Sequence, residues 1–343
     1  MQYRMLQAGP LLDDNGALLE AGYALSPIKR YERGKIKAPN RQIKEWDDYI
    51  IMQDACALHF RISDLGTLGE DTVTFADFDR PFEQTVSRRI TRPMGTRELP
   101  PLEGGTLRCQ GKQYEFTFRP VENALHVYGH MYDFGGPRRP LLFDFILHCP
   151  REDMMVLCMP FGGNATQFSL SQKSCCLPAD GRIIFDDREY LFSPAAAFGM
   201  TARHRGVWPR RSSRGWGGAS GIVMGKRFGL NLGRHGGHTG EATENALFYD
   251  GVAHKLENAI FHETRVNGRA DPMAPYFVTD DQERLRLTFT PLTSSRSVQR
   301  ALLTKVDRQL LFGRFSGEAQ LDSGVRLQID RLTGFMEYTS GRR

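Results

Sequence analysis

The sequence contains none of the short motifs that mark the common cofactor-dependent enzymes. There is no GxxxxGK[ST] phosphate loop, no GxSxG nucleophile elbow, no HExxH metal motif and no CxxC pair. The glycine-rich run GGASGIVMG lacks the strand-to-helix context of a dinucleotide fingerprint. We therefore expect that the protein uses no nucleotide and no other cofactor.

Long apolar segments are missing as well. The run MMVLCM after Asp153 is far too short to span a bilayer, and the first sixteen residues lack the apolar core of a signal peptide. We expect a cytoplasmic protein without stable membrane insertion. The six cysteines have no metal-ligand spacing and are expected to be buried thiols.

An excess of charge of one sign is also absent. The 343 residues include 45 basic and 40 acidic side chains, a net charge of +5, which is too balanced to indicate a nucleic-acid partner. One local cluster stands out, with two interpretations: a solvated basic loop or an anion-facing surface. Its members are Arg203, Arg205, Arg210, Arg211 and Arg214.

What the chain does contain is a long series of short strand patterns. Tyr114, Phe116 and Phe118 alternate with polar residues, and similar runs recur about every ten residues with turn signals between them. Only residues 297–312 have a plausible helical period, and a strand is the alternative there. The pattern predicts an antiparallel all-β protein, and closure into barrels would remove its many strand edges. We expect two β-barrel domains, residues 1–195 after an irregular lead-in and residues 196–343.

Residues 203–256 concentrate the side chains that could form a site. This segment holds two of the three tryptophans, four of the nine histidines and twelve of the 35 glycines. Trp208 and Trp216 combine large apolar rings with one N–H donor each. Arg205 and Arg214 could stack on those rings or hold an anion. We predict that these four residues contact a ligand at the wall or mouth of a cavity, with ordinary core packing of the two rings as the alternative.

Several polar residues of the same segment are candidates for chemistry. His204 is a candidate general acid or base, or else a loop histidine bonded to the backbone. Glu244 is the second catalytic candidate. With Asn245 it would orient a polar ligand group or cap the preceding loop. Asn231 is expected to point inward and to need a partner, either ligand or protein.

His235, His238 and Glu241 have the spacing HxxHxxE and are candidate metal ligands in this segment. Two histidines and a carboxylate can bind zinc. However, the surrounding GRHGGHTGE is a glycine-rich loop without a helix to fix the ligand geometry. We therefore expect no metal site.

Several blocks in their order resemble the bacterial family catalogued as domain of unknown function 2804. They are DDNGALLEAGYALSPIKRY, the pair Lys44 and Trp46, SLSQK, RGVWPRRSSRGWGGASG, FGLNLG, TENALFYDGVAHKL and FGRFSGEAQLDSGVRLQIDRLTGFMEY. This family is in turn similar to a wider lipocalin-like group that includes a carotenoid hydratase, tocopherol cyclase, fungal cyclases and a yeast survival factor. The resemblance implies two lipocalin-like β-barrels in tandem, apolar ligands and, in some members, proton-driven chemistry.

The resemblance also implies an acidic residue just before the Arg-Gly of the central block. This chain reads TARHRG there and has no carboxylate between Glu189 and Glu241. If the acid is the proton donor of the family, His204 replaces it here, or the activity has been lost.

Two functions are consistent with these features. The first is a binding module that holds a small apolar or amphipathic molecule in a barrel cavity. The second is a cofactor-independent enzyme, a hydratase, isomerase or cyclase, that acts on a terpenoid-like or lipid-like substrate by general acid/base catalysis. A deep apolar cavity with one isolated ionisable group would favour the enzyme.

Overall fold

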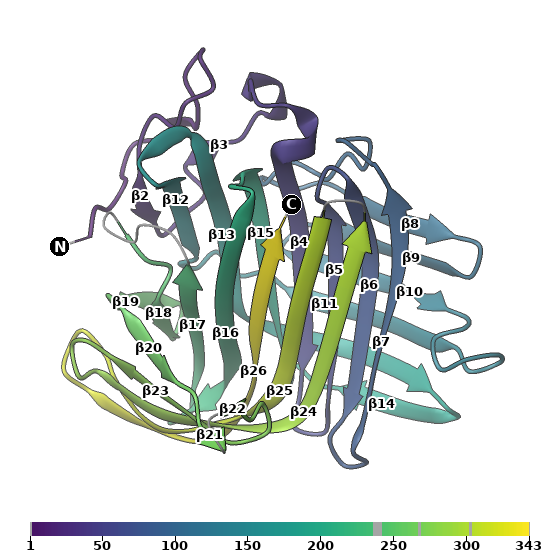
Figure 1. Ribbon diagram of the computed structural model, residues 1–343. Helices are drawn as coiled ribbons and strands as arrows, with labels where there is room; N and C mark the ends of the chain where they lie inside the picture. Colours follow the sequence, from purple (N-terminus) through teal and green to yellow (C-terminus); the bar gives the residue numbers. More distant parts are fainter. Residues whose placement is uncertain (1, 236–241, 267–268, 302–303, 343) are drawn as a thin grey trace.

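The computed structural model describes residues 2–235, 242–266, 269–301 and 304–342. These residues form β-strands, turns and two 3-10 helices, η1 (Arg33–Lys35) and η2 (Asn40–Gln42), with no α-helix among them. The predicted all-β class is confirmed, and the two tandem lipocalin-like barrels take the form of two curled antiparallel half-barrel sheets (Figure 1). Residues 297–312 lie in strands where they are described, so the helical alternative for that stretch is wrong.

The first sheet is formed by the N-terminal part of the chain. Its strands run in the order β7-β6-β5-β4-β15-β13-β11-β10-β9-β8, with β12 and β14 paired to β13, and β2 paired to β12. The strand bounds are β2 (Gly22–Ala24), β4 (Ile43–Met52), β5 (Cys56–Asp64), β6 (Leu68–Asp77), β7 (Phe82–Thr91), β8 (Leu107–Gly111), β9 (Tyr114–Val121), β10 (Ala124–Met131), β11 (Leu141–His148), β12 (Met155–Phe161), β13 (Asn164–Phe185), β14 (Arg188–Phe192) and β15 (Phe198–Val207). A separate parallel pair in the lead-in joins β1 (Gly9–Pro10) and β3 (Lys29–Arg30).

The second sheet is formed by the C-terminal part, in the order β19-β18-β17-β16-β26-β25-β24-β23-β20. The strand bounds are β16 (Arg211–Val223), β17 (Lys226–His235), β18 (Ala246–Tyr249), β19 (Val252–Lys255), β20 (Ala259–His262), β23 (Tyr276–Asp280), β24 (Leu285–Ala301), β25 (Thr304–Gln320) and β26 (Arg326–Arg342), with a separate pair β21 (Arg265–Val266) and β22 (Arg269–Ala270). The chain passes from the first sheet to the second between Val207 and Arg211. The predicted domain boundary at residues 195 and 196 stays a prediction.

The long strand β13 bends because of a bulge at two adjacent cysteines. Its first part pairs with β12 and β15, its last part with β11 and β14, and the register with β15 shifts between Ser174 and Leu177. Cys176, within this bulge, has φ +59, in the left-handed region. All six cysteines are free and five are buried.

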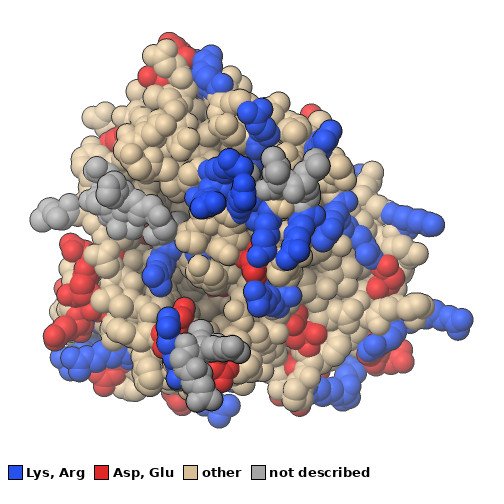
Figure 2. Space-filling model, viewed as in Figure 1, with Lys and Arg blue, Asp and Glu red and all other residues tan. Residues whose placement is uncertain are grey.

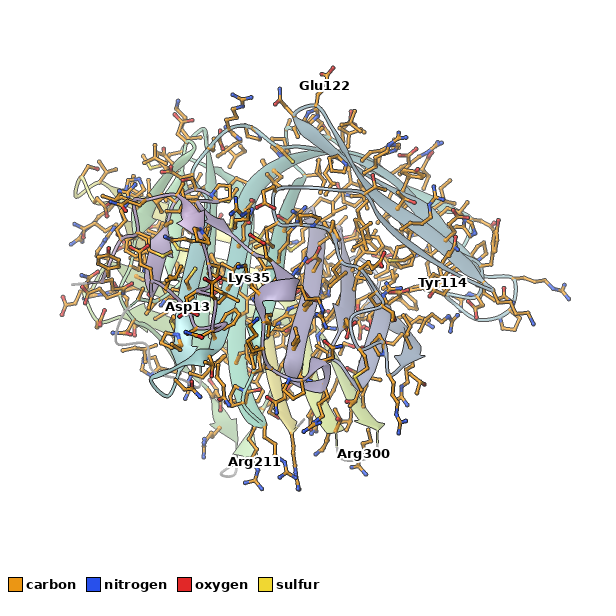
Figure 3. All side chains as sticks on the ribbon, turned by 90° about the horizontal axis from the view of Figure 1, so that it is seen from above. Asp13, Lys35, Tyr114, Glu122, Arg211 and Arg300 are labelled. Carbon is orange, nitrogen blue, oxygen red and sulfur yellow. The ribbon has the colours of Figure 1, made fainter. Side chains whose placement is uncertain are left out.

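Each sheet encloses its own apolar core. Strands β8–β11 and β14 lie behind β4–β7 and run across them (Figure 1), and Phe60 packs there against Phe116 and Phe118. Seen from above, Tyr114 and Glu122 mark the two ends of this crossing layer (Figure 3). In the second half-barrel, Phe289 and Phe315 pack against each other, with ring centroids 4.7 Å apart.

The two sheets also pack against each other through a third apolar cluster, which joins residues such as Ile50 and Met200 of the first sheet to Trp216 and Phe335 of the second. Strand β4 is therefore buried on both faces along its whole length. Charged side chains of both signs are scattered over the face seen in Figure 2, with Lys and Arg gathered near the C-terminus. No helix of the described part is long and apolar enough to cross a membrane.

Candidate functional site

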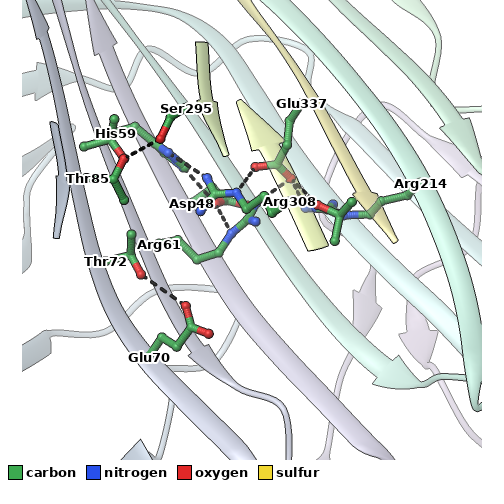
Figure 4. Close-up of polar contacts among 12 residues, drawn as sticks. Asp48, His59, Arg61, Glu70, Thr72, Thr85, Arg214, Ser295, Arg308 and Glu337 are labelled. Atoms are coloured by element: carbon green, nitrogen blue, oxygen red, sulfur yellow. Dashed lines mark hydrogen bonds and ion pairs between the residues drawn. The ribbon is translucent and has the colours of Figure 1, made fainter. Parts of the chain in front are cut away.

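A connected group of charged side chains lies between the two sheets, where β4 and β5 face β16, β25 and β26 (Figure 4). We call it the central polar cluster. It consists of Asp48, His59, Arg61, Arg214, Arg308 and Glu337. All six side chains are buried, because β4 and β5 carry polar residues on the face that meets the second sheet.

The two carboxylates of the cluster are held by three arginines. Arg61 and Arg214 each donate a 2.9 Å hydrogen bond to Oε1 of Glu337, and Arg308 donates one of 2.6 Å to Oε2. Arg61 also donates two bonds, 2.7 and 2.9 Å, to Asp48. Burial alone would raise the pKa of both carboxyls, but the guanidinium groups outweigh it and hold each pKa well below its usual range.

Arginine contacts determine the tautomers of the two buried histidines. A guanidinium can only donate, so Nδ1 of His59, 3.0 Å from Arg308, accepts, and its Nε2 carries the proton that it donates to Asp48 at 2.9 Å. His204 has the opposite arrangement: its Nε2 accepts from Arg214 at 3.4 Å, so its Nδ1 carries the proton. Burial and the nearby cations lower the pKa of His59 to about 4 and that of His204 well below its usual value. Both imidazoles are therefore neutral near pH 7.

His59 makes the stability of the fold depend on pH. Its pKa is about 6.5 in the unfolded chain and about 4 in the fold, so between these values the unfolded state binds the additional proton. The free energy of unfolding should therefore fall as the pH drops from 7.5 to 4.5, and His59 should account for roughly 2–3 kcal/mol of that fall. The variant His59→Gln can make the same two hydrogen bonds without titrating.

Urea unfolding at both pH values, in the two proteins, checks this prediction. The carboxylates contribute equally to both, so the difference between the two pH slopes isolates His59. Equal slopes in the wild type and His59→Gln would contradict the assigned tautomer and burial.

A second buried group adjoins the cluster through His204 and Arg214. Lys173 donates a 2.7 Å hydrogen bond to Glu244, and both side chains are almost fully buried. The ammonium of Lys173 also lies 4.3 Å from the ring centroid of Trp216, a cation–π distance. Trp216 in turn donates to Oδ1 of Asn231 at 2.7 Å.

The structure thus brings together five of the eight residues predicted for the site. They are His204, Arg214, Trp216, Asn231 and Glu244. Asn231 is satisfied by protein alone, because its amide also donates to the backbone oxygen of Glu244 at 2.6 Å. Whether His204 and Glu244 are catalytic, and whether the other three bind a ligand, stays a prediction.

The remaining three predicted residues point elsewhere. Arg205 is paired with buried Asp47 at 2.7 Å, Trp208 packs against Trp46 and Phe161, and Asn245 bonds to the backbone of Gly233 and Glu257. The HxxHxxE side chains of His235, His238 and Glu241 lie outside the described residues.

Sequence reasoning missed most of the central polar cluster. His59 and Arg61 alternate with apolar residues in β5, and Asp48 follows Asp47 in β4, so both strands look like strands with a solvated face. The available signal was that β25 and β26 also carry charged residues, Arg308 and Glu337, within strand-like runs. Two strand pairs with complementary charges on their polar faces can pack those faces together.

A small cavity of about 30 Å³ adjoins the cluster beside Trp46, Arg61, Arg214 and Arg308. The buried polar atoms Nε1 of Trp46, Oγ of Ser63 and Oε1 of Gln299 belong to residues that line it, and they have no hydrogen-bond partner among the described residues. This volume accommodates about one or two water molecules.

A larger cavity of about 270 Å³ lies within the second half-barrel, and we call it the apolar cavity. It is lined by Gly215, Trp216, Arg234, Phe261, Glu263, Pro272, Tyr276, Gln309, Leu311, Met336, Glu337 and Tyr338. Trp216 and Glu337 belong to strands β16 and β26, which carry the buried polar groups on one face and form a wall of this cavity with the other.

A polar space of about 630 Å³ adjoins the apolar cavity, and we call it the vestibule. The two share Gly215, Arg234, Phe261, Glu263 and Tyr338. Ser213, Arg214, His262 and Arg265 complete the lining of the vestibule. Figure 2 shows a hollow on this face of the molecule, below the gathered Lys and Arg side chains.

The family model for a domain of unknown function, DUF2804, matches residues 2–342, and the chain belongs to this family. No curated protein matches the sequence. Among solved structures, an AttH-type protein from Nitrosomonas europaea is similar, with TM-score 0.53, 14% identity, and coverage of 92% of this chain and 98% of that one.

Two further solved structures are similar at lower scores. Kievitone hydratase from Nectria haematococca has TM-score 0.47 and 9% identity over 90% of this chain and 91% of that one. CghA has TM-score 0.41 and 10% identity over 97% of each chain. At 14% identity, the likeness to the AttH-type protein concerns the fold alone.

Proposed function

We propose that this DUF2804 protein binds a small amphipathic molecule in the apolar cavity of its second half-barrel. The observation that carries the proposal is the arrangement of one apolar cavity behind one polar vestibule. Small-molecule sites usually combine apolar walls with a few placed polar groups, and their volumes begin at roughly 300 Å³. The apolar cavity lies near that lower limit, and the vestibule enlarges the available space.

The walls indicate how such a molecule would be oriented. Phe261, Tyr276, Leu311 and Met336 offer aromatic and aliphatic surface to its apolar part. The polar part would lie in the vestibule, whose lining includes Ser213, Arg234, His262 and Arg265. A cytoplasmic location, expected from the sequence, is part of this proposal.

Filling the cavity tests the proposal. The variant Met336→Trp places an indole inside the apolar cavity and should weaken binding of the neutral amphiphile octaethylene glycol monododecyl ether by about tenfold or more, which corresponds to a loss of about 1.4 kcal/mol. Isothermal titration calorimetry measures the affinity. Val252→Trp adds the same ring at a position that is 53% exposed and outside the cavity, and serves as the control. Equal affinity of both variants and the wild type would refute the proposed site.

A cofactor-independent enzyme is the second candidate, favoured by one observation. Nδ1 of His204 carries a proton, is buried and has no partner among the residues that the structure describes. Because the lowered pKa keeps the ring neutral, this N–H would act as a hydrogen-bond donor to a reacting oxygen rather than as a strong acid.

Mass spectrometry of the compound that copurifies with the protein distinguishes the two candidates. After incubation in H₂¹⁸O or D₂O, a hydratase or isomerase leaves ¹⁸O or deuterium in the compound, whereas a binding protein returns it unlabelled. Label that persists in His204→Ala would exclude His204 from the chemistry.

A further inference from the structure

The concave face of the second sheet carries a graded series of side chains along three adjacent strands, β16, β26 and β25. Residues directly opposite one another in antiparallel strands point to the same face. Four successive rows of this face are Arg211–Arg342–Lys305, Ser213–Ser340–Asp307, Gly215–Tyr338–Gln309 and Gly217–Met336–Leu311. The face thus changes from cations through hydroxyls to the wall of the apolar cavity.

The cation row continues onto a fourth strand, because Lys305 is paired with Arg300 of β24. All four side chains are exposed. In Figure 2, Lys and Arg side chains gather over these strand ends, and in Figure 3 Arg211 and Arg300 project from the same edge of the molecule. Like charges that lie directly opposite each other across strands are destabilising. An anion bound across the row would offset that repulsion.

The carboxylate nearest to this row is already engaged. Asp307 accepts two hydrogen bonds from Arg296, at 2.9 and 3.0 Å, while its distance to Lys305 is 3.9 Å. A groove of about 380 Å³ is lined by Arg211, Lys305 and Arg342 together with Ser212, Ser213, Asp307, Ser340 and Gly341, and its one carboxylate is the Asp307 already bonded to Arg296. Guanidinium, ammonium and hydroxyl donors around one groove suit an oxyanion such as a phosphate group.

The groove is continuous with the proposed ligand site. It shares Ser213 with the vestibule, which in turn shares five residues with the apolar cavity. From Arg342 to Met336 is six residues along β26, a distance of roughly 20 Å at about 3.3 Å per residue. The face therefore offers an anion site and an apolar site at the two ends of one path.

We propose that the ligand is an extended anionic amphiphile, with its oxyanion group in the groove at Arg211, Lys305 and Arg342 and its apolar end in the apolar cavity. This inference rests on the function proposed above and adds the charge and the length of the ligand. It also assigns an anion-binding role to Arg211. The sequence left the basic cluster that includes Arg211 as either a solvated loop or an anion-facing surface.

Two probes with the same alkyl chain test the inference: dodecyl phosphate and the neutral octaethylene glycol monododecyl ether. The wild type should bind dodecyl phosphate about tenfold more tightly or better. The double variant Lys305→Gln/Arg342→Gln should lose that preference and bind the neutral probe as the wild type does. Arg108→Gln/Arg326→Gln removes two exposed arginines elsewhere and should bind both probes normally. Titration calorimetry gives the affinities, and circular dichroism establishes that each variant is folded.

The outcomes separate this inference from the proposed function. Weaker binding of both probes by Met336→Trp, together with loss of phosphate preference in Lys305→Gln/Arg342→Gln, supports both. If the neutral probe binds in the cavity but the groove variant keeps the full affinity for dodecyl phosphate, this inference is wrong and the proposed function stands. If inorganic phosphate binds as tightly as dodecyl phosphate and Met336→Trp changes neither, the groove is a separate anion site and the inference is wrong. If neither probe binds, both proposals fail.

Discussion

Replacing Glu337 with glutamine is expected to lower the free energy of unfolding by roughly 3–5 kcal/mol. The carboxylate accepts hydrogen bonds from Arg61, Arg214 and Arg308, and all four side chains are buried. Glutamine keeps one acceptor oxygen, and its NH₂ group would face an arginine donor instead of accepting from it. Asp48 would then remain as the carboxylate of the central polar cluster, opposite three buried cations.

Chemical denaturation of Glu337→Gln and of a matched control measures the effect. Glu318→Gln makes the same substitution in the neighbouring strand β25 at an exposed position, and should change stability by less than about 0.5 kcal/mol. A similar small change for both variants would mean that water, rather than the three arginines, solvates Glu337.

The central polar cluster has a structural consequence beyond its own stability. The bonds from Arg61 to Glu337 and from Arg308 to His59 each cross from one sheet to the other. These hydrogen bonds are directional, so they favour one orientation of the two half-barrels. The apolar contacts in the cluster of Ile50, Phe312 and Phe335 are not directional and restrict the orientation less. Because Glu337 lies between Met336 and Tyr338 on β26, the strand that carries this carboxylate also forms a wall of the apolar cavity.

The fold was largely predictable because most strands obey one local rule. Period-two alternation in β9 and β11 and the turn residues at Asp186-Asp187 and Asp250-Gly251 mark strands and hairpins directly. Residues 297–312 were ambiguous because their strands carry charges on a buried face, as Arg308 does. That ambiguity is resolved only by the partner sheet, which no local pattern reveals.

The site was predictable only in part, and strand geometry explains the division. His204 and Arg205 are consecutive residues of β15, so their side chains point to opposite faces of the sheet. His204 lies with the second sheet's Arg214, and Arg205 lies with Asp47 on the other face. The sequence alone left His204 as a possible loop residue, whereas in strand β15 the parity of the two residues excludes a shared cavity. The charges from distant strands, such as Asp48 and Glu337, could not be assigned in this way.

Replacing Arg205 with methionine is expected to lower the free energy of unfolding by roughly 3–5 kcal/mol while leaving ligand affinity unchanged. Its guanidinium donates to Asp47 at 2.7 Å and to the backbone oxygens of Trp46, His204 and Pro100 at 3.0–3.2 Å, and it is only 1% exposed. Methionine would fill much of the volume but would leave Asp47 with the long 3.3 Å hydrogen bond from the Tyr49 hydroxyl and would remove the Arg205 donor from these carbonyl groups. None of the cavities described above has Arg205 in its lining.

Arg203→Met is the matched control. Arg203 lies on the same strand and the same face as Arg205, but its contact with Asp47 is longer. Its Nε is 4.0 Å from Asp47 and its Nη1 donates to the backbone oxygen of Leu102 at 2.7 Å, so its removal costs one hydrogen bond and a long ion pair, a loss of roughly 1–2 kcal/mol. Urea unfolding gives the stabilities, and titration with octaethylene glycol monododecyl ether gives the affinities of the folded variants. An Arg205→Met protein with wild-type stability and no affinity for the amphiphile would restore Arg205 to the ligand site. Lower stability with unchanged affinity for the amphiphile would instead show that Arg205 neutralises Asp47 inside the first half-barrel.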